Sequence, residues 1–106
     1  MLKRNKQVSK EMAEKIKEFL SYDSQTGIIR WKKSAARRIK VGYRAGCTHP
    51  NGHIEIYVAG RKFMAHHLAW LLYYGEMPDC LVFHSNGKKS DNSIQNLTMS
   101  QSATYN

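Results

Sequence analysis

Paired cysteines are absent from this sequence. Its two cysteines, Cys47 and Cys80, stand alone, without the C-x-x-C spacing that is typical of zinc knuckles and redox motifs. We therefore expect a reduced protein of the cytoplasm.

Long apolar runs and repeats are absent too. No stretch is long and apolar enough to span a membrane, and the basic segment Met1 to Lys10 lacks the apolar centre of a signal peptide. At 106 residues, the chain is long enough for one domain with a modest core and too short for two. We therefore expect one domain over residues 1–106, flexible over residues 1–8, with no membrane partner.

Acidic residues are absent between Arg30 and Arg44, where the chain carries seven cations. Residues 1–50 hold thirteen Lys or Arg against four acids, whereas residues 51–106 hold four of each, so the first half carries the whole net charge of +9. Such density is typical of a surface that binds the phosphate backbone, where each neutralised phosphate releases counterions without reading the bases. A solvated basic surface is the alternative interpretation. The residues expected to bind double-stranded DNA are Arg30, Lys32, Lys33, Arg37, Arg38, Lys40 and Arg44.

The apolar pattern predicts an α+β domain. Apolar side chains recur at spacings of three and four from Met12 to Leu20, which indicates an amphipathic helix capped by Ser9. Later runs of β-branched and aromatic residues between turn residues predict strands. In chain order we expect a helix over 9–21, a turn over 22–27, a strand over 28–31, an exposed basic loop over 32–44, a hairpin with strands 53–58 and 61–64, and a buried helix from Ala65 that ends at Gly75.

The most informative motif runs from Leu81 to Leu97. It places a histidine at the end of a β-like run, then an Asn-Gly turn, an Asp-Asn pair, and an Asn-Leu pair twelve residues after the histidine. Upstream lie Tyr22-Asp23, Thr26-Gly27, Trp31, Gly42, Gly46 and Ala65-His66-His67-Leu68-Ala69-Trp70. This ordered series resembles the HNH endonuclease superfamily, in particular its phage and homing members.

The resemblance implies a metal-dependent DNA endonuclease with a ββα-metal motif over residues 81–106. The motif would comprise a strand over 81–84, a second strand over 97–100 and a helix from Ser100, around one divalent ion, Mg²⁺ or Mn²⁺. His84 matches the family's general base, Asn96 matches the asparagine that orients this histidine by a hydrogen bond, and Asn106 matches the final metal-binding position. We expect the protein to act as a monomer.

Each assignment also has a structural alternative. A histidine in a strand is more commonly a satisfied polar residue than a base, and Asn96 could equally cap a turn. His66 could be a buried packing residue or a group of the site, and His67, where the family usually has Arg, would face solvent or DNA. Asn92, like its neighbour Asp91, would support the site by pinning the loop through side-chain to backbone bonds.

The sequence departs from the family at metal-binding positions. Phe83 stands where most relatives have an Asp ligand, and a phenyl ring cannot coordinate a cation. Asn106 is displaced by one residue, and Thr98 and Ser93 replace arginines that are common in the family. Two hypotheses follow: an active endonuclease, and a DNA-binding protein that retains the fold without the chemistry. An RNA-binding domain is less favoured, because no aromatic pair occupies alternating strand positions.

Overall fold

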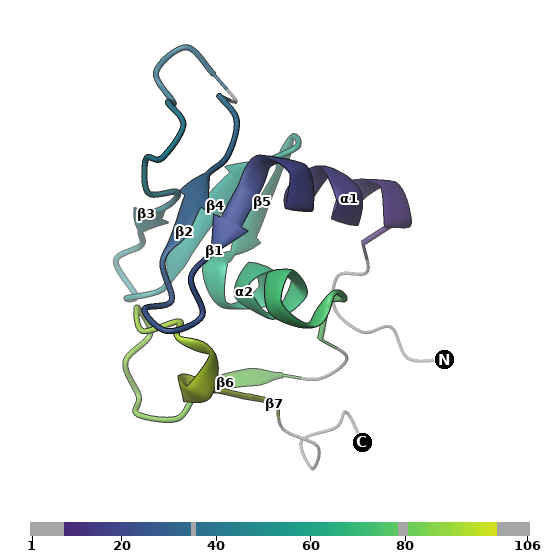
Figure 1. Cartoon of the computed structure of the whole chain (residues 1–106). Helices are drawn as coiled ribbons and strands as arrows, with labels where there is room; N and C mark the ends of the chain where they lie inside the picture. Colours follow the sequence, from purple (N-terminus) through teal and green to yellow (C-terminus); the bar gives the residue numbers. More distant parts are fainter. Residues whose placement is uncertain (1–7, 35, 79–80, 100–106) are drawn as a thin grey trace.

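The computed structural model describes residues 8–34, 36–78 and 81–99, and it has the expected α+β architecture (Figure 1). Its elements are α1 (Lys10–Phe19), β1 (Leu20–Tyr22), β2 (Ile29–Trp31), β3 (Cys47–Thr48), β4 (Ile54–Val58), β5 (Arg61–Met64), α2 (Ala65–Tyr74), β6 (Val82–His84), the 3₁₀ turn η1 (Ile94–Asn96) and β7 (Leu97–Met99). The predicted flexible start over residues 1–8, except for Val8, and the predicted helix from Ser100, with Asn106, lie outside the described residues. No helix in the described ranges has the length and apolar character needed to cross a membrane.

The strands pair in three small antiparallel sheets. β1 pairs with β2, β4 lies between β3 and β5, and β6 pairs with β7. The register of the last pair sets His84 opposite Leu97. The helix α2 contacts β1, β4, β5 and η1 (Figure 1). It therefore connects the sheets formed by β1 to β5 with the segment that contains η1. The strands predicted near 81–84 and 97–100 are confirmed: β6 begins one residue later than expected, and β7 covers the described part of the second range.

A single hydrophobic core holds these elements together. Its most deeply buried apolar side chains come from α1, β1, β4 and α2: Ile16, Leu20, Ile56, Leu68 and Leu71. The predicted helix over 65–75 is confirmed, with Gly75 in the left-handed conformation at its C-terminal cap. Because the core faces only one side of α2, Tyr73 and Tyr74 at its end are about half exposed.

The first helix begins as predicted and ends early. The Ser9 hydroxyl accepts a hydrogen bond from the Met12 backbone N–H at 3.1 Å, which satisfies one of the free donors of the first turn. The helix ends at Phe19 rather than at residue 21, because residues 20–22 leave it to pair with β2. The prediction was wrong here because Leu20 is apolar on either a helix face or a strand face.

The hairpin and the basic loop follow the prediction closely. Ala59 and Gly60 both have positive φ, 53° and 79°, as a two-residue turn between β4 and β5 requires. The basic segment is irregular, with only isolated bridges between Arg30 and Arg44 and between Ala36 and Ile39. The short strand β3 was not predicted. It pairs at the edge of β4 and adds an exposed cysteine, Cys47, which forms no disulfide within the described residues.

Candidate active site

His84 lies at the end of β6, half-buried, with one ring nitrogen fixed. Its Nε2 lies 2.8 Å from Oδ1 of Asn92. An amide oxygen only accepts hydrogen bonds, so this contact holds the imidazole proton on Nε2. In the neutral ring, Nδ1 is then the nitrogen with a lone pair available for a proton.

Two further imidazole rings surround His84. The ring of His66, from the first turn of α2, lies 4.9 Å from that of His84 between centroids, and the ring of His53, just before β4, lies 5.8 Å away. His53 and His66 stack on each other at 5.1 Å. The fold therefore gathers histidines from three distant segments. We did not predict His53 as a site residue, since its segment carries no motif and only the β4 pairing brings it here.

Burial keeps these neighbouring rings neutral. Burial, followed by the charges of nearby histidines, lowers the pKa of His66 to about 3. Burial first, and then the charge of Lys89, lowers the pKa of His53, whose buried Nδ1 has no hydrogen-bond partner among the described residues. Both shifts favour the neutral form of the ring beside His84. His67, half-buried, extends this group, with its ring 4.4 Å from that of His66.

Asn96 holds the loop that follows His84 rather than His84 itself. Its Oδ1 accepts a hydrogen bond from the Asn86 backbone N–H at 2.9 Å, and its Nδ2 donates to the Asp91 carbonyl at 2.8 Å. The Ser85 backbone N–H also donates to the Asn96 carbonyl. The expectation that Asn96 bonds to His84 is therefore corrected: Asn92 makes that bond, because the loop returns Asn92 to the His84 ring and turns Asn96 toward the loop backbone.

Asp91 pins the same loop, as expected. Its Oδ1 accepts from the backbone N–H and the hydroxyl of Ser93, and its Oδ2 accepts from the Asn86 amide at 3.0 Å. The side-chain bond from Ser93 is the largest cause that lowers the pKa of Asp91. The carboxylate is thus committed to the loop. The expected side-chain to backbone bond of Asn92 is replaced by its bond to the His84 ring.

The turn between β1 and β2 supports the Asn92 backbone. The Tyr22 hydroxyl donates to the Asn92 carbonyl at 2.6 Å, and the Ile94 backbone N–H donates to the Ser24 carbonyl at 2.9 Å. Burial raises the pKa of Tyr22, so its hydroxyl stays protonated and available as a donor. At Gly27 a Cβ atom would lie 2.4 Å from the Asn92 carbonyl carbon. The turn and the Asn92 backbone therefore lie in direct contact.

Substituting Gly27 by alanine should destabilise this contact strongly. Gly27 has φ +81°, and the added Cβ would overlap backbone atoms that cannot rotate away. A left-handed alanine costs about 1–2 kcal/mol, and overpacking costs about 1–3 kcal/mol more, so we expect a loss of about 3 kcal/mol in the free energy of unfolding. Chemical denaturation would measure it.

Gly42→Ala is the matched control for that substitution. Gly42 has φ +93° and no neighbour within 4 Å of its added Cβ, so only the backbone cost applies, about 1–2 kcal/mol. Equal losses in the two variants would contradict a close contact between Gly27 and the Asn92 backbone.

The described residues do not fit a Mg²⁺ site. Magnesium prefers several oxygen ligands in a near-octahedral arrangement. Around His84, the Asn92 amide oxygen bonds to Nε2, and the neighbouring rings of His53 and His66 offer only imidazole nitrogens. Asp91 is committed to the loop, and Phe83, which is 46% exposed, offers only a phenyl ring. Across the described ranges, no three His, Cys, Asp or Glu side chains are arranged to hold a metal ion.

Some cations of the basic loop bond to other groups of the protein, and others do not. Arg30 donates to the Gly42 carbonyl at 3.0 Å, Lys32 donates to the Lys17 carbonyl at 3.0 Å, and Lys33 forms an ion pair with Glu18. Within the described part of the chain, the exposed side chains of Arg37, Arg38 and Lys40 have no hydrogen-bond or ion-pair partner. The loop projects from one end of the molecule, and β6 and β7 lie toward the other end (Figure 1).

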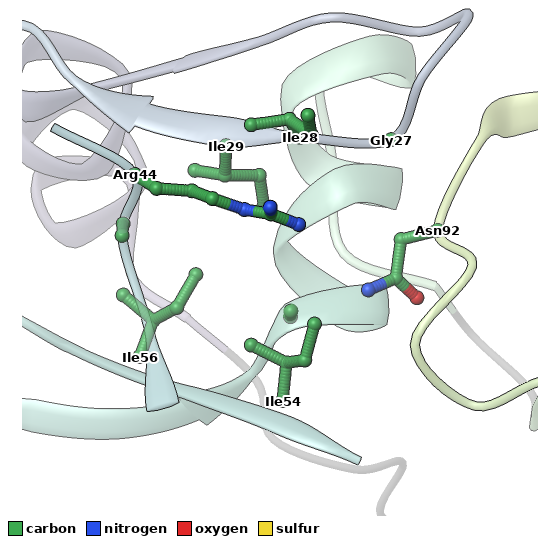
Figure 2. Close-up of a pocket in the computed structure, with 9 residues that line it drawn as sticks. Gly27, Ile28, Ile29, Arg44, Ile54, Ile56 and Asn92 are labelled. Carbon is green, nitrogen blue, oxygen red and sulfur yellow. The ribbon is translucent and has the colours of Figure 1, made fainter. Parts of the chain in front are cut away.

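Arg44 connects the basic loop to the neighbourhood of His84. It lines a small hollow together with Ile54, Ile56 and Asn92, among others. Figure 2 shows the Arg44 side chain extending across this hollow, with its guanidinium group toward Asn92. Sequence reasoning placed Arg44 with the loop cations only.

Residues 63–103 match a family model described as HNH endonuclease. The matched range begins within β5, continues through β7 and includes His66, His84 and Asn96. No curated protein and no solved structure matches the chain.

Proposed function

Because this chain belongs to the HNH superfamily, we propose that it hydrolyses phosphodiester bonds in double-stranded DNA, with His84 as the general base. The observation that carries this proposal is the fixed orientation of the imidazole: His84 lies within the matched segment, its Nε2 bonds to Asn92, and its Nδ1 makes no hydrogen bond to the described residues. A base must present a basic nitrogen in a fixed direction, and this contact supports that role.

In the proposed reaction, His84 removes a proton from the attacking water. The oxygen of that water forms a bond to phosphorus as one of its protons passes to Nδ1, the bond from phosphorus to the leaving ester oxygen breaks, and the leaving oxygen takes a proton from solvent. The resulting imidazolium keeps its Nε2–H bonded to Asn92 Oδ1, so the ring does not have to turn during the transfer. The rings of His53 and His66 lie beside the ring of His84.

DNA would be bound chiefly by the unengaged cations of the basic loop. Arg37, Arg38 and Lys40 are free to contact phosphates, while Arg30, Lys32 and Lys33 make bonds that shape the base of the loop. The molecule is 44 Å long, and one turn of DNA is about 34 Å long. A duplex along the long axis could therefore contact both the loop and the His84 region.

We further propose that cleavage requires one divalent ion, Mg²⁺ or Mn²⁺, as the family resemblance implies. Such an ion stabilises charge at a scissile phosphate when it is bound. The described side chains do not supply its ligands. Under this proposal, Asn106, which lies outside the described ranges, together with water and the DNA phosphate, would contribute ligands.

Plasmid nicking tests the proposed function directly. Purified protein incubated with supercoiled plasmid and a titration of Mg²⁺ or Mn²⁺ should convert the plasmid to its open-circular or linear form. Addition of EDTA should abolish the conversion. Plasmid that stays supercoiled with either metal, while gel shift shows binding, would contradict the endonuclease.

A DNA-binding protein without catalysis is the second candidate. Phe83, at the position where relatives carry a metal ligand, is the observation that favours it. Under this alternative, the basic loop binds DNA and the His84 region has lost its chemistry. A single substitution at residue 83 separates the two candidates.

Phe83→Asp should raise Mg²⁺-dependent cleavage on the order of tenfold or more if only this ligand limits the reaction. The phenyl ring is 46% exposed, so its loss removes little packing. Initial nicking rates of both proteins over a metal titration would measure the effect.

Leu81→Asp is the matched control, because Leu81 is similarly exposed, at 45%, and precedes β6 by one residue. It adds the same charge away from the family's ligand position and should not raise cleavage. An unchanged rate in Phe83→Asp would contradict a site limited by this ligand. Absence of cleavage by either protein with any divalent ion would favour the DNA-binding candidate.

A further inference from the structure

Asn92 is unusual among the polar residues of this fold because it is almost completely buried. Its exposed fraction is 2%, and it is the only polar residue among the largest fully buried side chains of the described ranges. A buried amide that loses its partner cannot compensate with bulk water, so its bonds are costly to break. Its one side-chain partner in that part of the chain is the Nε2 of His84.

The Asn92 backbone is fixed by a segment about 70 residues earlier in the chain. The Tyr22 hydroxyl reaches its carbonyl at 2.6 Å, and Gly27 packs against its carbonyl carbon. Two residues on, Ile94 bonds to the Ser24 carbonyl at 2.9 Å. The support of Asn92 therefore does not depend on its own loop alone.

Resting on the proposed function, we propose that Asn92 is the positioning residue of His84 and that the Tyr22 hydroxyl holds Asn92 in place. Asn92 selects the tautomer with the proton on Nε2 and directs Nδ1 toward the reacting water. Tyr22 acts one step further away, through the backbone of Asn92.

The other groups that face His84 cannot take over this role. The rings of His53 and His66 contact the His84 ring through their faces and edges. In the described ranges, neither forms a hydrogen bond with it, and no carboxylate does. Loss of the Asn92 amide would thus leave the ring of His84 free to change tautomer and orientation.

The ¹⁵N NMR spectrum of the His84 ring tests this role without any need for cleavage. The resonances can be assigned by their loss in His84→Gln. In the wild-type protein above pH 7, the proton should be on Nε2. Asn92→Ala should give a mixture of the two tautomers, whereas Asn92→Asp, which keeps an oxygen acceptor, should retain the proton on Nε2.

Cleavage kinetics provide the second readout. Asn92→Ala should lower kcat on the order of tenfold or more with little change in KM, because the base is misdirected while the DNA contacts are intact. Asn92→Asp should recover most of kcat. The acid limb of its pH–rate profile should move to higher pH, because a carboxylate favours the imidazolium.

Tyr22→Phe extends the test with a smaller structural change. The ring stays and only the hydroxyl is lost, so we expect a few-fold fall in kcat and partial mixing of the His84 tautomers. Tyr57→Phe is the matched control: Tyr57 lies on β4, is 68% exposed, and should leave both readouts unchanged.

The outcomes separate this inference from the proposed function. A wild-type proton on Nδ1, or an unchanged tautomer in Asn92→Ala, would overturn the positioning role whether or not the protein cleaves DNA. If Asn92→Ala does not fold, Asn92→Asp and Tyr22→Phe decide by the same two readouts. A wild type that holds the proton on Nε2 but never cleaves would contradict the endonuclease and leave the contact itself supported.

Discussion

Replacing His84 by alanine should lower the rate of plasmid cleavage by on the order of a hundredfold or more, with DNA affinity nearly unchanged. The substitution removes the imidazole whose Nε2 bonds to Asn92 and whose Nδ1 has no hydrogen-bond partner in the described part of the chain. The charged loop that we expect to bind DNA is untouched. Single-turnover cleavage and a gel shift on the same preparation would measure the two effects separately.

His49→Ala is the control for this substitution. His49 is exposed, and its ring contacts Glu55 at 3.7 Å instead of joining the histidines around His84. It should cleave at the wild-type rate. A His84→Ala protein that also cleaves at the full rate would show that His84 is not the base.

Replacing Arg37, Arg38 and Lys40 together by alanine should weaken binding to all DNA sequences alike. These three exposed cations have no partner within the described ranges, so they are free to neutralise phosphates. Each lost phosphate contact should reduce the slope of log affinity against log salt by about one, so we expect a reduction of up to about three. Affinities measured at several salt concentrations give this slope.

The matched control replaces Lys10, Lys15 and Lys17, which removes the same charge from the exposed side of α1. A purely general effect of net charge would change both slopes equally. An unchanged slope in the loop variant would identify the loop as a solvated surface that does not bind DNA.

Local patterns were sufficient to predict most of the elements. The apolar spacing and the Ser9 cap predicted α1, and the Ala59-Gly60 turn between alternating residues predicted the β4–β5 hairpin. Predictions failed where pairing between segments decides the structure. The end of α1 and the strand β3 both depend on a partner strand elsewhere in the chain, which local periodicity does not contain.

In the candidate site, too, local sequence predicted some features, and contacts between distant segments determined the others. The motif was sufficient to propose His84, because the Asn-Gly turn and the later asparagines lie close in sequence. It did not distinguish Asn92 from Asn96 as the partner of the ring, since both follow His84 within twelve residues and the loop path determines which one returns. His53 was not predicted at all, because it joins the other histidines only through the fold.

The contact between residues 22–27 and Asn92 limits how the segment that matches the family model can be transferred to another protein. The family match begins at residue 63, yet the groups that fix the Asn92 backbone precede it by about forty residues. A graft of residues 63–103 alone would carry the histidine motif without the tyrosine hydroxyl and the glycine surface that support it. The smallest segment that could be transferred with these contacts intact therefore includes the β1–β2 hairpin. The amino-terminal part of the chain thus supports the candidate site structurally and also supplies positive charge.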